Sequence, residues 1–196
     1  MVNQVRLVHA LLPAVLAGML LAGDAAAHPH VFIDASVEVV FGAPGFTGVR
    51  VTWAFDDLFS STILTSFERD GSGGFSPAGI KEIEERHLES FRSFGYFLDI
   101  TANGSPVPVA SVKDFRVRVD KAQVIYAFTA VVNPPAEPQG ALAIVVDDPT
   151  FYSAFAVVEP VRVQAAAEYQ AECRLARDAA TNRPEGIACT YRRRSG

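Results

Sequence analysis

Two histidines separated by a single proline are the residues of this sequence best suited to chemistry. Neutral imidazole is a common ligand for nickel, cobalt, zinc and copper ions. Pro29 has no backbone N–H to deprotonate, so a metal ion here must be held by side chains or by a terminal amine. We expect His28 and His30 to bind a divalent transition metal ion, with Asp34 and Asp56 as the acidic ligands. The alternative is that this segment is the polar beginning of a strand, and that its histidines face solvent without binding a metal ion.

The residues before this motif are typical of a secretory signal peptide. Arg6 supplies a short positive region, residues 11–22 are apolar but too few to span a bilayer comfortably, and the small residues at 25–27 match a signal peptidase site. Cleavage there would leave the first histidine with a free amine beside its imidazole. We predict a signal peptide over residues 1–27 and a single domain outside the cytoplasm over residues 28–196, with no direct membrane anchor after cleavage.

A predicted β-hairpin must bring the acidic residues to the histidines. Residues 31–41 and 49–55 alternate between apolar and polar side chains, which predicts two half-buried strands. The register follows from placing apolar residues across from apolar residues and positive charges across from negative ones. The expected pairs are Phe41–Thr47, Val39–Val49, Glu38–Arg50, Ile33–Phe55 and Phe32–Asp56. In this register Asp56 lies diagonal to His30 and Asp34, so the three share one patch.

The rest of the chain predicts a helical insertion followed by strands. We expect one helix with Asp57 as its N-cap and a second from the cap Ser76 to Phe94, the first burying Leu58, Ile63, Leu64 and Phe67. The strands are expected at residues 96–101, 111–119, 124–132, 141–147 and 156–165, with an edge pair within residues 168–191. The predicted class is α+β: an N-terminal β-hairpin, a helical insertion with a degenerate EF-hand-like turn, and a run of antiparallel strands.

The stretch between the two predicted helices, residues 68–79, resembles an EF-hand calcium loop. Oxygen-bearing residues stand at loop positions one, three, five and nine, and a glycine stands at position six. Position one is Glu68, however, and position twelve is Gly79 instead of the glutamate that closes the coordination sphere. We interpret the segment as a degenerate loop that joins two helices, and we do not expect it to bind calcium.

Two further sets of polar residues have competing interpretations. His87 lies on the apolar stripe of the second helix, where a hydrogen-bonded core histidine is favoured over a metal ligand facing the hairpin. Asp147 and Asp148 precede Pro149. They either present two carboxylates at a strand end or form an acidic turn that Asp148 caps, and the turn is the favoured interpretation.

Charge and cysteine content narrow the function classes. The chain has 17 Lys and Arg against 22 Asp and Glu, for a formal net charge of −5, and its one basic run is residues 192–194. Without a basic stripe to neutralise phosphates, we do not expect nucleic acid as a partner. Cys173 and Cys189 are expected to form a disulfide in an oxidising compartment, the alternative being a pair of thiolate metal ligands.

The motifs of common enzymes are missing from the sequence. There is no Gly-x-Ser-x-Gly, no evident Cys–His pairing, and no glycine-rich loop with the lysine and preceding strand that phosphate binding requires. We therefore expect a binding protein without catalytic activity.

Five segments, taken in order, resemble the domain-of-unknown-function 1007 family. They are the opening at residues 27–34, the Trp-x-Phe-Asp segment at 51–60, the EF-hand-like loop, residues 95–97, and residues 148–152. The resemblance covers essentially the whole chain after the signal peptide. It implies a periplasmic component of an uncharacterised ABC-type transport system of a kind that often accompanies nickel or cobalt permeases.

These observations lead to two hypotheses. The first is a periplasmic accessory of a metal transport system that binds a divalent cation through His28, His30, Asp34 and Asp56. The second is a metal-independent adaptor that docks on a membrane permease through sheet edges or through the phenylalanine-rich helical insertion.

Overall fold

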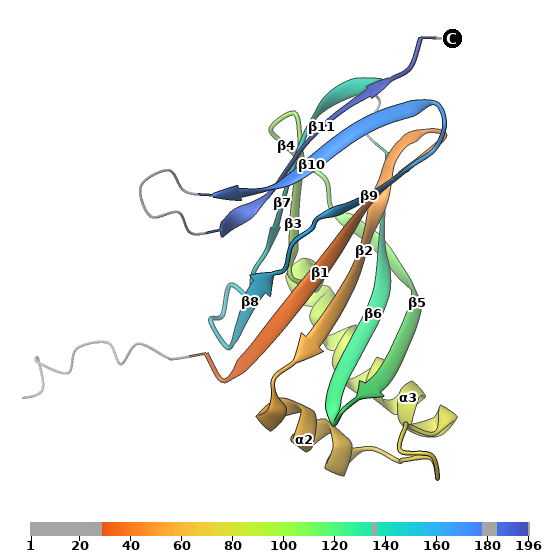
Figure 1. Cartoon of the computed structure of the whole chain (residues 1–196), viewed down its shortest axis with the longest axis vertical. Coiled ribbons are helices and arrows are strands. Elements are labelled where there is room, and N and C mark those ends of the chain that lie inside the picture. Colours follow the sequence, from red (N-terminus) through yellow and green to blue (C-terminus); the bar gives the residue numbers. More distant parts are fainter. Residues whose placement is uncertain (1–28, 135–136, 178–183, 196) are drawn as a thin grey trace, which may run out of the picture.

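The computed structural model describes residues 29–134, 137–177 and 184–195. Within these residues the chain is mostly β-strand, arranged in two sheets, with one helical insertion between β2 and β3 (Figure 1). The strands are β1 Val31–Gly42, β2 Gly45–Phe55, β3 Leu98–Ala102, β4 Ser105–Pro106, β5 Val109–Asp120, β6 Gln123–Val132, β7 Gln139–Val146, β8 Ser153–Val157, β9 Arg162–Ala165, β10 Tyr169–Arg177 and β11 Pro184–Arg193.

The leading hairpin, β1 and β2, has the predicted register along most of its length. The pairs Val39–Val49, Glu38–Arg50 and Ile33–Phe55 are all present, and Arg50 Nη1 lies 2.8 Å from Glu38 Oε2. Near the turn, Phe41 pairs with Phe46 and not with Thr47, because a bulge follows Val40. The bulge turns the Phe46 side chain into the core, where it is fully buried.

The first sheet has the order β5-β6-β2-β1-β8, and β9 also pairs with β1. Both β8 and β9 run parallel to β1, so the prediction of a purely antiparallel run is wrong here. The single strand expected at residues 156–165 is also two strands. Pro160 stands between them and has no N–H to donate to a neighbouring strand, which interrupts the pairing.

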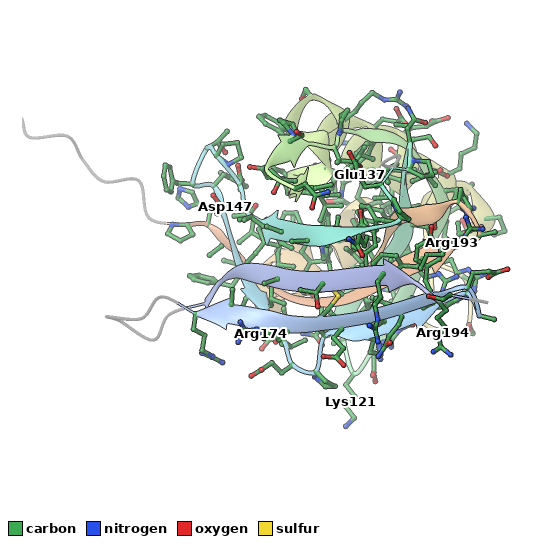
Figure 2. All side chains as sticks on the ribbon, turned by 90° about the horizontal axis from the view of Figure 1, so that it is seen from above. Lys121, Glu137, Asp147, Arg174, Arg193 and Arg194 are labelled. Carbon is green, nitrogen blue, oxygen red and sulfur yellow. A yellow bond between two sulfur atoms is a disulfide. The ribbon has the colours of Figure 1, made fainter. Side chains whose placement is uncertain are left out.

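The second sheet has the order β10-β11-β7-β3-β4, and its inner face shares one hydrophobic core with the first sheet. Phe41 of β1 lies 6.2 Å from Tyr169 and 5.3 Å from Tyr191, centroid to centroid, which joins the two layers. Cys173 and Cys189 stand opposite each other on β10 and β11 and form a disulfide, as predicted. Figure 2 shows Arg193 and Arg194 at the opposite end of this sheet from Asp147.

The first helix, α2 Asp57–Ser66, begins one residue earlier than expected. Its N-cap is Asp56, whose Oδ1 accepts a hydrogen bond from the Phe59 N–H at 2.8 Å, and not Asp57. The helix turns Ile63 onto the sheet and leaves Leu58 76% exposed, so the predicted burial of Leu58 is wrong. Phe59, Ile63 and Phe67 are spaced four residues apart and pack on the core. They therefore decide which face of the helix is buried.

The second helical segment starts as predicted but does not continue as one α-helix. Ser76 caps α3 Pro77–Ile83 by accepting a hydrogen bond from the Gly79 N–H at 3.0 Å. A π-helical turn, η1 Glu84–Leu88, and a 3-10 segment, η2 Glu89–Phe97, follow. The wider π turn separates the buried Ile83 and Leu88 by five residues, so His87 moves to the edge of the buried stripe. Figure 1 shows α2 and α3 at the end of the first sheet where β2 finishes.

Candidate functional site

Asp56 links the hairpin to the first helix. The Phe32 N–H donates to Asp56 Oδ2 at 2.6 Å, and the Asp56 N–H donates to the Phe32 carbonyl at 2.9 Å. Phe32 and Asp56 are therefore opposite each other, as predicted. Because the other carboxylate oxygen caps α2, both oxygens of Asp56 already accept backbone hydrogen bonds.

Of the other residues of the predicted metal site, two are exposed and one lies outside the residues that the structure describes. His30 and Asp34 are exposed on β1 or just before it, and the His30 ring lies 5.3 Å from the Tyr152 ring, centroid to centroid. Among the described residues, no group of three or more His, Cys, Asp or Glu side chains is close enough to hold a metal ion. His28 is outside the described residues. The metal site of His28, His30, Asp34 and Asp56 therefore stays a prediction.

A compact loop at residues 147–153 is built around the buried side chain of Asp148. Its Oδ1 accepts from the Thr150 N–H at 2.8 Å and the Thr150 hydroxyl at 2.7 Å, and its Oδ2 accepts from the Ser153 N–H at 3.0 Å. Burial would raise the pKa of Asp148, but these hydrogen bonds outweigh it and hold the pKa below its usual value. The favoured turn interpretation of this segment is confirmed. These hydrogen bonds order the loop, which leaves Phe151 68% and Tyr152 53% exposed.

This loop forms one wall of an apolar pocket of about 200 Å³. The other walls come from β1, the end of β2, the first turn of α2 and the η2 segment. Aromatic rings dominate the lining: Trp53, Phe55, Phe59, Phe91, Phe94 and Phe97, with Tyr152 beside them. Trp53 is fully buried, and its indole N–H has no hydrogen-bond acceptor in the part of the chain that the structure describes.

Two of the large exposed apolar side chains line this pocket. Phe94 and Tyr152 line it while remaining 43% and 53% exposed. Phe32, Leu58 and Phe151 are each next in sequence to a lining residue and are more than half exposed. The end of the molecule that carries the pocket therefore also presents apolar surface to its surroundings.

The backbone around the pocket is strained. Tyr96 and Phe97, which follow Gly95, have φ values of 58° and 55°, and Phe151 has a φ of 59°. Bulky side chains rarely adopt this left-handed conformation, which costs about 1–3 kcal/mol per residue and clusters at functional sites. Other described residues with positive φ lie elsewhere, but these three are the aromatic ones.

The segments that line the pocket can be recognised in the sequence, but their meeting in space cannot. Residues 51–60, 95–97 and 148–152 were each recognised as parts of a family resemblance, and each contributes lining side chains. Their shared signal is aromatic content beside a turn. The pocket itself was missed because those segments are far apart in the sequence and no periodicity connects them.

The loop at residues 68–79, between the two helices, holds its own acidic side chain. Asp70 Oδ1 accepts hydrogen bonds from the Ser72 N–H, the Ser72 hydroxyl and the Gly74 N–H, all within 2.9 Å. The hydrogen bonds from Ser72, followed by that from Gly74, lower the pKa of Asp70. A Cβ added at Gly79 would lie 2.2 Å from the Glu68 carbonyl oxygen, so the close approach of the two loop ends depends on that glycine. The loop has the form of a helix-to-helix turn.

His87 is the core histidine that the sequence favoured. Its Nδ1 is 2.8 Å from the Tyr126 hydroxyl, and its ring packs against Phe59 and Phe67. Burial, followed by the positive charge of Arg86, lowers the pKa of His87. These contacts occupy the side chain, and His87 faces the core instead of the hairpin patch.

No helix in the described part of the chain is both long enough and apolar enough to cross a membrane. The disulfide between β10 and β11 is a bond that proteins of oxidising compartments typically contain.

Comparison with known proteins gives a family. A family model described as a protein of unknown function (DUF1007) matches residues 13–190. An uncharacterized protein of Haemophilus influenzae is 23% identical over 145 residues, which cover 72% of this chain and 68% of that relative. Because the family model spans most of the sequence, this chain belongs to the DUF1007 family.

Proposed function

We propose that this protein is a periplasmic binding component of a transport system for a divalent transition metal ion. In this proposal a signal peptide over residues 1–27 is removed, and the new terminus at His28 holds the ion. In this proposal His30, Asp34 and Asp56 complete the ligand set once the ion binds. The ion is the cargo of the protein and takes part in no reaction on it.

The observation that supports this proposal is the pairing of Phe32 with Asp56. His30 and Asp34 stand two residues before and two residues after Phe32, which faces Asp56, so an ion held by all three would require a small adjustment of their side chains. Both oxygens of Asp56 accept backbone hydrogen bonds, yet a carboxylate has lone pairs to spare for a metal ion. The disulfide agrees with the proposed compartment.

The proposal is tested by calorimetry on the exported protein, after mass spectrometry has identified its first residue. Nickel, cobalt, zinc and copper are titrated separately. We expect at least one ion to bind more tightly than about 0.1 mM. The double variant His28→Ala with His30→Ala should abolish that binding. Asp34→Asn should weaken it, whereas Asp99→Asn, an exposed aspartate on β3 of the other sheet, should not.

Two results would overturn the metal proposal. One is an absence of binding tighter than about 0.1 mM for all four ions. The other is binding that the double histidine variant leaves unchanged.

A second candidate function is a metal-independent adaptor that docks on a membrane permease. The specific observation in its favour is the exposed aromatic surface around the pocket, because apolar surface of this kind marks interaction sites. Co-purification with a permease that persists in the presence of a chelator would support this candidate, and loss of the complex on chelation would count against it.

A further inference from the structure

We propose that one end of the second sheet binds a phosphate ester of a hydroxyl-rich compound, such as a sugar phosphate. The site is a hollow of about 590 Å³ at the end of the sheet that carries Arg193 and Arg194, opposite the end that carries Asp147 (Figure 2). It is separate from the aromatic pocket, and the proposal depends on neither of the two candidate functions. The residues that line the hollow are Gln139, Gln170, Arg192, Arg193, Arg194 and Ser195.

Three neighbouring strands place a row of polar side chains in this hollow. Arg192 of β11 pairs with Gln170 of β10 on one side and with Gln139 of β7 on the other. Residues directly opposite each other on neighbouring strands point to the same face of a sheet. Arg192 Nε and Nη2 donate to Gln170 Oε1 at 3.2 and 2.8 Å, so two members of the row hold each other in place.

The backbone of the next two arginines is anchored on both sides of β11. The Arg193 N–H donates to the Pro138 carbonyl, just before β7, at 2.7 Å. The Arg194 N–H donates to the Glu168 carbonyl, just before β10, also at 2.7 Å. Because the backbone of Arg193 and Arg194 is held in this way, only their side chains must become ordered when an anion binds.

The arginines of the hollow are not paired with acidic side chains. Within the described part of the chain, no carboxylate lies within ion-pair distance of Arg192, Arg193 or Arg194. The side chains of Arg193, Arg194 and Gln139 also make no hydrogen bond to another described residue. A guanidinium group is always charged and carries five N–H donors and no acceptor. An excess of charged donors around one hollow favours an anion with several oxygens.

A phosphate group matches these donors better than a carboxylate does. Arginine binds both groups through paired N–H···O hydrogen bonds. A carboxylate offers two oxygens in one plane, whereas a phosphate monoester offers three and carries a charge of about −1.5 to −2 near pH 7. Arg193, Arg194 and the Gln139 amide can each meet a different phosphate oxygen. The volume of the hollow lies within the roughly 300–1,000 Å³ of small-molecule sites, which leaves room for an organic part.

A second hollow that continues from the first selects the organic part. Its volume is about 260 Å³, it shares Gln170 and Arg192 with the first hollow, and it adds the exposed Glu172 and Thr190. Hydroxyl groups of a ligand can donate to the Glu172 carboxylate and exchange hydrogen bonds with the Thr190 hydroxyl. The same carboxylate repels a second phosphate group. The two hollows together therefore favour one phosphate on a neutral, hydroxyl-rich body.

Calorimetry with a matched series of sugars tests the proposal. The exported protein, freed of metal ions by dialysis, is titrated with fructose, fructose 6-phosphate, fructose 1,6-bisphosphate and inorganic phosphate. We expect fructose 6-phosphate to bind with a dissociation constant on the order of 0.1 mM. Fructose and inorganic phosphate should each bind roughly tenfold more weakly or worse, because each fills only part of the site. The bisphosphate should bind roughly three- to tenfold more weakly, because Glu172 repels its second phosphate.

A matched pair of double variants locates the binding. Arg193→Gln with Arg194→Gln should weaken the binding of fructose 6-phosphate roughly tenfold or more. Arg116→Gln with Arg174→Gln removes the same charge from exposed positions outside both hollows, and should change the affinity less than about twofold. Glu172→Gln should raise the affinity for the bisphosphate to at least that for fructose 6-phosphate.

Vesicles distinguish a free compound from a lipid headgroup of the same chemistry. Phosphatidylglycerol carries a phosphate attached to a polyol, whereas phosphatidylcholine carries no polyol headgroup. Cosedimentation with phosphatidylglycerol vesicles alone, reversed by fructose 6-phosphate, would support the site with a lipid headgroup as its ligand. Binding of fructose 6-phosphate without cosedimentation would support the site with a free compound.

Three results would overturn the proposal. The first is binding of fructose 6-phosphate that is no tighter than that of inorganic phosphate, which would make the hollow an unselective anion site. The second is binding that the Arg193 and Arg194 double variant leaves unchanged. The third is an equal loss in both double variants, which would be an effect of net charge alone. Because the protein is free of metal ions and none of these residues belongs to the proposed metal site, these results leave the metal proposal untouched.

Discussion

At the scale of single residues, Asp148 is the buried carboxylate that orders the loop in one wall of the pocket. It is only 2% exposed, and its carboxylate orders the loop through hydrogen bonds from Thr150 and Ser153. Hydrogen bonds to a buried charged group are individually worth about 1.5–3 kcal/mol. The position of the exposed Phe151 and Tyr152 therefore depends on one carboxylate in the middle of an acidic turn.

Replacing Asp148 by asparagine should lower the free energy of unfolding by about 1–3 kcal/mol, because an amide cannot accept at both of its ends. The exposed neighbour Asp147→Asn is the control and should change stability by less than about 0.5 kcal/mol. Urea unfolding at pH 7 measures both.

The difference between wild type and Asp148→Asn should also depend on pH. The pKa of Asp148 is lower in the folded protein than its usual value of 3.8, so its stabilisation is fully present above that value. It should disappear as the pH falls through the folded pKa. A difference that persists unchanged at pH 2 would contradict this assignment.

His87 gives a second pH-dependent prediction, in a higher range. Burial lowers its pKa below the ordinary 6.5, so the unfolded chain takes up a proton at a higher pH than the folded protein. The stabilisation from neutral His87 is therefore present above pH 6.5 and is lost as the pH falls through the folded pKa. Between pH 7 and pH 5, thermal unfolding should show a steeper loss of stability for wild type than for His87→Gln. Parallel curves would rule out His87 as the source.

At the scale of elements, the helical insertion shows how local signals fix where a helix begins but not how it continues. Ser76 and Pro77 start α3 where the sequence places them, because a capping hydroxyl and a first-turn proline act within a few residues. The π turn at η1 and the strained aromatic residues after Gly95 follow from packing on the sheet, which a helical period does not encode.

The close approach of the two ends of the loop at residues 68–79 can be tested with a pair of glycines. Gly79→Ala should lower the free energy of unfolding by about 1–3 kcal/mol, because its Cβ would lie 2.2 Å from the Glu68 carbonyl oxygen. Gly71→Ala is the matched control, since no atom lies within 4 Å of the added Cβ and its backbone conformation is ordinary. Equal stabilities for the two variants, measured by urea unfolding, would show that the loop ends are not tightly packed.

At the scale of the whole molecule, two sheets are joined by a shared core. A disulfide links β10, the edge strand of the second sheet, to its neighbour β11. The bond connects residues separated by 16 positions. Closing a loop of this length stabilises a protein by about 3 kcal/mol through the entropy of the unfolded chain.

Replacing both cysteines by alanine should therefore lower the free energy of unfolding by about 3 kcal/mol. A reducing agent should have a similar effect on wild type and none on the double variant. Thermal unfolding with and without the reductant checks this. Equal melting temperatures for reduced and oxidised wild type would contradict the expectation.

The sequence by itself determined the features that arise from neighbouring residues. Alternation along β1 and β2, together with the charge pair Glu38–Arg50, sets the register of the hairpin and hence the pairing of Phe32 with Asp56. The Ser76 cap and the cysteine pair are of the same kind. Only the tertiary structure decided that β8 and β9 run parallel to β1 and that the 53–59, 94–97 and 148–153 segments meet around one pocket. The reason is physical: periodicity and capping act over a few residues, whereas pairing between distant strands depends on which apolar faces can be buried together.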